Sequence, residues 1–181
     1  MLYTKRGDDG KTSIYGCDQK ISKSSAITEA LGSLDETNSY LGVCKAQIHD
    51  SGFMIQDKKV WDIIHRVQNN LFTIQAQVAG ADKKLSEENI LWLEEIILEI
   101  DKQLPEIKSF LISGSTEISA GFDFARTLVR RAERRIVAVS EENITKIDSI
   151  TLSYMNRLSS LLYALARYFA TRSGVEESPT Y

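Results

Sequence analysis

Proline occurs at only two positions in this chain, Pro105 and Pro179, and three of the ten glycines fall within the first sixteen residues. Because these residue types most often interrupt helices, long stretches are free to be helical. Apolar residues there recur three, four or seven positions apart, the spacing of one buried helical face. This spacing predicts five helices, with Ser86 capping the third and Pro105 closing it. They are expected at about residues 25–50, 60–78, 86–104, 118–139 and 152–169.

No segment alternates apolar and polar residues between hairpin turns, so we expect no sheet beyond a short strand near the amino terminus. The predicted fold class is all-α, a five-helix bundle of the ferritin-like kind preceded by a glycine-rich loop. With 181 residues, 43% of them hydrophobic, the chain can bury a core as one domain. We expect residues 1–23 to form the loop, residues 24–173 the bundle and residues 174–181 a flexible, frayed tail.

Charge and cysteine content exclude several functions. A net charge of −3 and a pI of about 5.5 argue against a general nucleic-acid binder, although a local basic patch remains compatible with them. Neither a signal peptide nor an apolar run of about eighteen residues is evident, so we expect a cytoplasmic protein with no membrane segment. Cys17 and Cys44 form no C-x-x-C pair, which predicts neither a disulfide nor a zinc site.

Five arginines occupy the ten positions from 126 to 135. They divide between one helical face, Arg126, Arg130 and Arg134, and an adjoining flank, Arg131 and Arg135. Guanidinium groups stay charged and offer forked donors that suit phosphate oxygens, so this row predicts a triphosphate clamp. The alternative is a solvated face with ion pairs four residues apart. Against it, Glu133 is the only acid among these ten positions, where it could orient one of the arginines.

Small residues line one face of the first predicted helix. The face is made up of Gly32, Asp35, Ser39, Gly42 and Ala46. Such a face allows another backbone to approach closely, and Asp35 would then need a cationic partner. We hypothesise that Asp35 pairs with Arg126 or Arg130, within one chain or between subunits. The alternative is an exposed aspartate in ordinary helix packing.

The amino-terminal segment from Thr4 to Ser13 contains the tripeptide Gly10-Lys11-Thr12. It is not a Walker A loop, because Lys5 stands where that motif needs its first glycine. Its glycines, lysines and hydroxyls nevertheless suit a phosphate-binding loop. The alternative is an ordinary polar turn at a chain terminus.

Four blocks in this order resemble the PduO-type ATP:cob(I)alamin adenosyltransferases. They are the Thr4–Ser13 loop with Lys23, then Leu31–Ser39, Ala125–Arg134 and Tyr154–Ser159. The resemblance implies a five-helix bundle that assembles as a homotrimer with active sites between neighbouring subunits. It also implies a reductase and an adenosylcobalamin-dependent enzyme as further partners.

The resemblance implies roles for individual residues. One side of the ATP site would be formed by Thr4, Lys5, Arg6, Gly7, Thr12, Ser13 and Lys23. The other side would be formed by Arg130, Arg131, Glu133, Arg134 and Asn156. Asp35 and Arg126 would make an ion pair between subunits. Phe110 would approach the corrin and disfavour a lower axial ligand on cobalt.

The reaction implied is transfer of the 5′-deoxyadenosyl group of ATP to the cobalt of cob(I)alamin, with release of triphosphate. Arg130, Arg134 and Mg²⁺ would stabilise the departing triphosphate. Two departures concern the corrinoid side. The family commonly has Pro-Gly-Gly where this chain has Ile112-Ser113-Gly114-Ser115, and it commonly has an aspartate where Ser160 stands.

Two other functional classes share features with this sequence. A non-catalytic ATP-binding helical regulator or adaptor derived from this family would keep the bundle and the nucleotide site. A di-metal carboxylate bundle needs Glu-x-x-His pairs on facing helices. The only histidines, His49 and His65, follow Ala46 and Asp62 at that spacing, so we predict no metal site formed by the protein.

Overall fold

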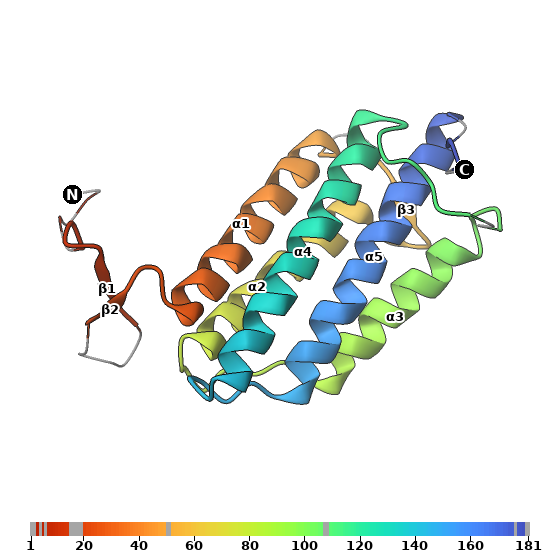
Figure 1. Ribbon diagram of the computed structural model, residues 1–181. Coiled ribbons are helices and arrows are strands. Elements are labelled where there is room, and N and C mark those ends of the chain that lie inside the picture. Colours follow the sequence, from red (N-terminus) through yellow and green to blue (C-terminus); the bar gives the residue numbers. More distant parts are fainter. Residues whose placement is uncertain are drawn as a thin grey trace.

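Five helices form the body of the molecule and lie side by side as a bundle (Figure 1). The computed structural model describes residues 3, 5, 7–14, 20–49, 52–106, 109–175 and 177–179. The helices are α1 (Ala26–Gln47), α2 (Val60–Val78), α3 (Glu87–Asp101), α4 (Glu117–Glu141) and α5 (Ser149–Ser173). The prediction of an all-α five-helix bundle is confirmed. None of the helices in the described segments is long and apolar enough to cross a membrane.

The helix α4 lies between α1 and α5, while α2 packs on α1 and α3 packs on α5 (Figure 1). The predicted apolar faces meet in one core, where Leu34, Ile64 and Val129 are fully buried. The rings of Phe122 on α4 and Phe169 on α5 stack with their centroids 5.3 Å apart. Since α4 contributes its apolar side to this core, its arginines lie along the outer side of the bundle, whereas its acid Asp123 is buried.

Side chains cap three of the helices. Ser86 forms a capping box with Asn89 at the start of α3, as the sequence predicted. The Thr116 hydroxyl accepts a hydrogen bond from the backbone of Ser119, and Asp148 accepts one from the backbone of Thr151. These caps satisfy backbone N–H groups that a helix leaves unpaired at its first turn.

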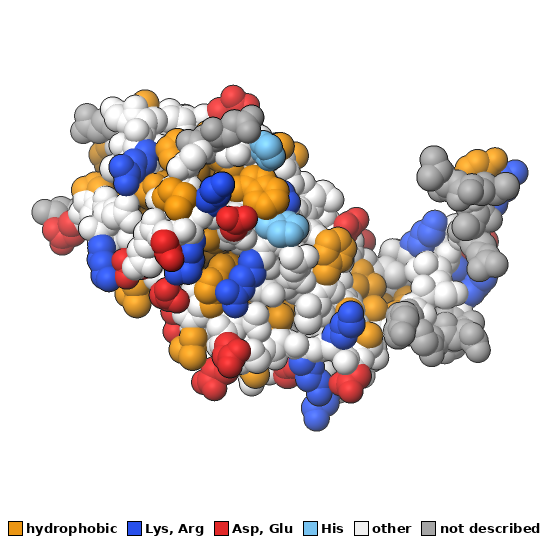
Figure 2. All heavy atoms as spheres, turned by 180° about the vertical axis from the view of Figure 1, so that it is seen from behind, with side chains coloured by type: hydrophobic (Ala, Val, Ile, Leu, Met, Phe, Trp, Pro, Cys, Tyr) orange, Lys and Arg blue, Asp and Glu red, His pale blue; other side chains and the backbone are white. Residues whose placement is uncertain are grey.

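Two short antiparallel hairpins accompany the helices: β1 (Lys11–Ser13) with β2 (Lys20–Ser22), and β3 (Met54–Ile55) with β4 (Lys58–Lys59). The first hairpin extends the single strand that the sequence predicted, and the second was not predicted. A two-residue strand is too short to show alternation, and its turn depends on Gln56 in the left-handed region at φ 53°. The first hairpin projects from the bundle on a narrow connection (Figures 1 and 2).

Residues 177–179, which belong to the segment expected to form a flexible tail, contact a loop earlier in the chain. The backbone N–H of Ile112 donates a hydrogen bond of 2.8 Å to the carbonyl oxygen of Ser178, and Leu111 pairs with Pro179 in an antiparallel bridge. The pairing joins the chain end to a loop more than sixty residues earlier. Local sequence carries no sign of such a distant partner.

Candidate functional site

Within the arginine row of α4, Arg130 and Arg134 differ from the flank, Arg131 and Arg135, in having no acidic partner among the described residues. Arg130 and Arg134 are exposed, and neither forms an ion pair with any residue that the structure describes. Their one mutual contact joins an Nη1 donor of Arg134 to the backbone oxygen of Arg130, at 3.0 Å. Two guanidinium groups one helical turn apart offer forked donors that suit a multiply charged anion.

The flank is neutralised by the helix α1. Arg131 forms a hydrogen-bonded ion pair with Glu36, and Arg135 lies 3.8 Å from the carboxylate of Glu29. The sequence argument treated all five arginines as uncompensated because it counted acids within α4 only. That part of the argument is wrong, since the compensating acids come from the neighbouring helix. The row therefore offers fewer free charges than its sequence suggested.

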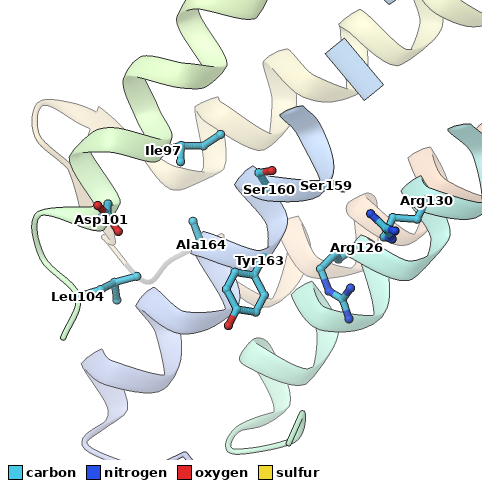
Figure 3. A pocket seen from close by; sticks show the side chains of 9 residues that line it. All are labelled: Ile97, Asp101, Leu104, Arg126, Arg130, Ser159, Ser160, Tyr163 and Ala164. Carbon is cyan, nitrogen blue, oxygen red and sulfur yellow. The ribbon is translucent and has the colours of Figure 1, made fainter. Parts of the chain in front are cut away.

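A hollow of about 320 Å³ lies beside Arg126 and Arg130 of the row, between α3, α4 and α5 (Figure 3). It is lined by Ile97, Asp101, Leu104, Arg126, Arg130, Ser159, Ser160, Tyr163 and Ala164. The lining joins two guanidinium groups to an aromatic ring and aliphatic side chains, so it can receive a molecule that is partly charged and partly apolar. Ser160, one of the two departures from the family pattern, lies on its wall.

Arg126 is half-buried in this hollow and incompletely paired. Its Nε lies 3.9 Å from a carboxylate oxygen of Asp123 and makes no hydrogen bond with the described residues. The residue proposed as its partner, Asp35, is exposed on α1 and has no ion pair within the described segments. The hypothesis that Asp35 pairs with Arg126 or Arg130 within one chain is therefore wrong. Its other form, a pair between subunits, stays a prediction.

The small-residue face of α1 lies at the surface of the chain instead of between two of its own helices. Gly32, Ser39 and Ala46 are exposed like Asp35. A Cβ atom placed on Gly32 would meet nothing within 4 Å, and one on Gly42 would meet only the side-chain amide of Gln68 at 3.6 Å. Among the helices that the structure describes, none uses the close approach that these residues allow.

The amino-terminal loop forms a tight glycine turn that is hydrogen-bonded to the backbone of Lys23. The N–H of Gly10 donates to the oxygen of Gly7 at 3.1 Å, and the N–H of Lys23 donates to the oxygen of Gly10 at 3.0 Å. Gly7 has φ 95°, and a Cβ there would lie 2.7 Å from the oxygen of Lys11 and 3.3 Å from Nζ of Lys23. Only glycine fits this position without moving the backbone.

A carboxylate fixes the hairpin that follows this turn. Asp9 accepts hydrogen bonds from Nζ of Lys20 at 2.9 Å and from the backbone N–H of Lys11 at 3.1 Å. The bond from Lys20 is the main cause that lowers the pKa of Asp9 below its ordinary value. The predicted contacts Lys5 and Ser13 are exposed around it, while Thr4 and Arg6 lie outside the described residues.

The structure does not bring the loop and the arginine row together within one chain. The hairpin stands clear of the bundle, whereas Arg130 and Arg134 lie on the body of α4 (Figure 1). Asn156 is on the bundle as well, exposed on α5, where its Oδ1 accepts a hydrogen bond of 2.9 Å from Arg157. Glu133 is half-buried beside the free arginines.

Phe110 lies in the connection between α3 and α4, and 86% of its surface is exposed. The exposed part of this ring is an apolar surface of the kind that a large apolar ligand can contact. The sequence argument missed the group that stands behind this loop, Arg167 with Asp123 and Glu177. A signal was present, because Arg167 interrupts an otherwise apolar stretch of the fifth helix and a buried arginine needs acids nearby.

Other reactive side chains that the structure describes make contacts outside this site. The ring of His65 stacks on Trp61 with 5.2 Å between centroids, and its Nδ1 lies 3.3 Å from Nζ of Lys45. Both histidines are visible beside a hydrophobic patch on the back of the molecule (Figure 2). Burial raises the pKa of Cys44 to about 12, which makes this thiol unreactive. Within the described ranges, no three His, Cys, Asp or Glu side chains are grouped to hold a metal ion.

Comparison with known proteins points to one family. A family model described as cobalamin adenosyltransferase matches residues 2–169. The corrinoid adenosyltransferase of Bacillus subtilis is 34% identical over 175 residues, a match that covers 96% of this chain and 89% of the relative. The corrinoid adenosyltransferase PduO of Citrobacter freundii is also 34% identical, and there the match covers 92% of this chain but only 49% of the relative. This chain therefore spans about half the length of that PduO protein.

Solved structures show the same fold. A variant of the PduO-type ATP:corrinoid adenosyltransferase from Lactobacillus reuteri, complexed with cobalamin and ATP, superposes with a TM-score of 0.87 at 30% identity. That match covers 99% of this chain and 96% of the other. A second variant of that enzyme, complexed with ATP, has a TM-score of 0.86 at the same identity and covers 99% of this chain and all of the other.

Proposed function

Because the chain belongs to the cobalamin adenosyltransferase family, we propose that it transfers the 5′-deoxyadenosyl group of ATP to the cobalt of cob(I)alamin. The products are adenosylcobalamin and triphosphate. The observation that carries this proposal is the family match over residues 2–169, which includes both the glycine loop and the arginine row. In this reaction cobalt is the nucleophile, so the protein needs no general base or covalent nucleophile of its own.

The protein acts on the ATP side through charge placement. Arg130 and Arg134 lack acidic partners among the described residues, so their positive charge is available to the triphosphate as it departs. Beside the glycine turn, the side chain of Lys23 offers an amine to the same phosphates. Thr12 and Ser13 would add hydroxyl groups beside them.

Mg²⁺ would arrive with the nucleotide. This ion is usually held by substrate phosphates and one or two carboxylates instead of by a full protein cage. The described residues fit that arrangement, since they contain no cluster of three acids but place Glu133 beside the two free arginines. Bound there, the ion would neutralise charge on the triphosphate.

On the corrinoid side, Phe110 and the hollow beside Arg126 are the parts we assign. Phe110 is exposed on its loop, and an apolar ring against the lower face of the corrin disfavours a lower axial ligand. Loss of that ligand makes reduction of cob(II)alamin easier. Water is kept from the reacting atoms by the same apolar contact.

The active site would be completed by a neighbouring copy of the chain in a homotrimer. Three features support this: the hairpin stands clear of its own bundle, Asp35 is exposed without a partner in the described segments, and the small-residue face of α1 is uncovered. In the trimer, the loop of one subunit would face the arginine row of the next, and Asp35 would pair with Arg126 across the interface. We place the enzyme in the cytoplasm, supplied by a reductase and delivering to an adenosylcobalamin-dependent enzyme.

An anaerobic assay with chemically reduced cobalamin, ATP and Mg²⁺ tests this function. We expect the absorbance spectrum to change to that of adenosylcobalamin, with one triphosphate released for each molecule formed. ATP binding without adenosylation would instead identify a non-catalytic regulator that kept the nucleotide site. A protein that bound neither substrate would contradict both functions.

A further inference from the structure

The guanidinium of Arg167 is almost fully buried between two carboxylates from different parts of the chain. Only 2% of its surface is exposed. Its Nη2 lies 2.5 Å from Oδ2 of Asp123 on α4, and its Nε lies 3.0 Å from Oε1 of Glu177. The ring of Tyr163, which lines the hollow beside Arg126, lies 4.9 Å from the guanidinium carbon. Arg167, Asp123 and Glu177 are not part of the site that the sequence predicted.

Glu177 begins the segment 177–179, which we name the carboxyl-terminal strap. The strap lies against the loop that carries Phe110, through the hydrogen bond from Ile112 to Ser178 and the bridge between Leu111 and Pro179. A cavity of about 530 Å³ lies where the strap, this loop and the ends of α3 and α5 meet, and Arg167 and Glu177 are on its wall. Contacts therefore run from α4 through Arg167 and the strap to the residues directly after Phe110.

Charge explains why the strap is held at Glu177. A guanidinium buried to this degree needs acceptors for its donors, and Asp123 occupies only one edge of it. The strap brings Glu177 to the other edge. Burial raises the pKa of Glu177 above its ordinary value, with Arg167 lowering it and Asp123 raising it further. The contact there is an ion pair and not a hydrogen bond, because neither Nε of Arg167 nor Oε1 of Glu177 has a hydrogen-bond partner among the described residues.

We infer that Asp123, Arg167 and Glu177 are positioning residues for the corrinoid side of the site, because they hold the strap that fixes the Phe110 loop. This inference rests on the proposed function, since it gives the loop its role in adenosylation. The three residues do not touch the reacting atoms. They act through the backbone of Leu111 and Ile112.

Substitution in the full-length protein tests the inference by two independent routes. Glu177→Lys places a second positive charge against Arg167, and Ile112→Pro removes the N–H that bonds to Ser178. In both variants we expect the amides of the peptide covering residues 109–115 to exchange hydrogen roughly tenfold faster. Adenosylation that starts from cob(II)alamin and a reductant should slow by about the same factor, while the Kd for ATP stays unchanged.

Two matched controls accompany these variants. Glu177→Gln keeps the size of the side chain but removes its charge, so it should speed exchange and slow the rate less than Glu177→Lys does. Glu141→Lys makes the same change in net charge at an exposed position at the far end of α4, and should alter neither measurement. Faster exchange in Glu177→Lys and Ile112→Pro with an unchanged rate from cob(II)alamin would overturn the inference. Unchanged exchange in both variants would overturn it as well.

Failure of the proposed function would look different. In that case the unsubstituted protein would form no adenosylcobalamin from cob(I)alamin and ATP. The hydrogen-exchange result would still report whether Glu177 and Arg167 hold the strap against the loop.

Discussion

Arg131 on α4 donates a hydrogen bond to Glu36 on α1, whereas Arg130, the residue before it, forms no ion pair with the described part of the chain. Two arginines adjacent in sequence therefore have different amounts of charge to offer a ligand. The paired arginine stabilises the contact between two helices. The free arginine is the one expected to carry the chemistry.

Arg130→Ala should lower kcat by about 10²–10³-fold, because loss of one group that stabilises developing charge has that typical cost. The matched control is Arg135→Ala, which removes an exposed arginine of the same helix that is paired with Glu29 of α1. An exposed ion pair contributes about 0–1 kcal/mol, so this control should retain both activity and stability. Steady-state kinetics under anaerobic conditions would measure both variants. Equal rates for the two would contradict the assignment of Arg130.

The sequence was sufficient to predict the helices because each has apolar residues at the spacing of one helical face. It was also sufficient to find the arginine row, but not to say which arginines are free, because Glu29 and Glu36 reach Arg135 and Arg131 from α1. Such pairing depends on how two helices pack and has no local signature. The same holds for the strap, whose partners lie on a distant loop.

Gly7→Ala should weaken ATP binding by roughly tenfold, the effect of about 1.4 kcal/mol in binding free energy. The added Cβ would lie 2.7 Å from the oxygen of Lys11 at a backbone φ of 95°, so the turn must open and carry Lys23 away. The control is Gly52→Ala, also at positive φ but with nothing within 4 Å of the added atom. Calorimetric titration with ATP distinguishes them. Identical affinities would remove the glycine turn from the nucleotide site.

Asp148→Ala should destabilise the fold by about 1 kcal/mol at pH 7, because the carboxylate caps α5. Burial raises the pKa of Asp148, but the hydrogen bonds from the Thr151 backbone and the Gln77 amide outweigh burial, and the pKa is lowered overall. Because the folded pKa lies below the unfolded value of about 3.9, the charge-linked stability is present above that pH. It is lost as the pH falls through the folded pKa.

Urea unfolding of the wild type and the Asp148 variants at pH 7 and near pH 3 would measure this linkage. The difference in free energy of unfolding between the wild type and Asp148→Ala should be smaller near pH 3 than at pH 7. Asp148→Asn, which keeps a cap, should cost less than the alanine variant at pH 7 and show a weaker dependence on pH. A larger difference in free energy of unfolding near pH 3 than at pH 7 would show that the pKa of Asp148 is raised instead of lowered.

Asp35→Arg should prevent trimerisation, because it would place a positive charge against Arg126 of a neighbouring subunit in the proposed interface. Arg126→Asp should do the same by placing two carboxylates together. The double variant restores one charge of each sign and should recover at least part of the assembly, which a loss of folding could not explain.

Sedimentation velocity at micromolar concentration measures the oligomeric state, with Glu141→Lys as the control for a charge reversal away from the interface. Because Asp35 and Arg126 make no ion pair with each other inside one chain, recovery in the double variant would have to come from contact between chains. A double variant no better than the single ones would contradict the proposed ion pair, and a wild type that sedimented as a monomer would contradict the shared site.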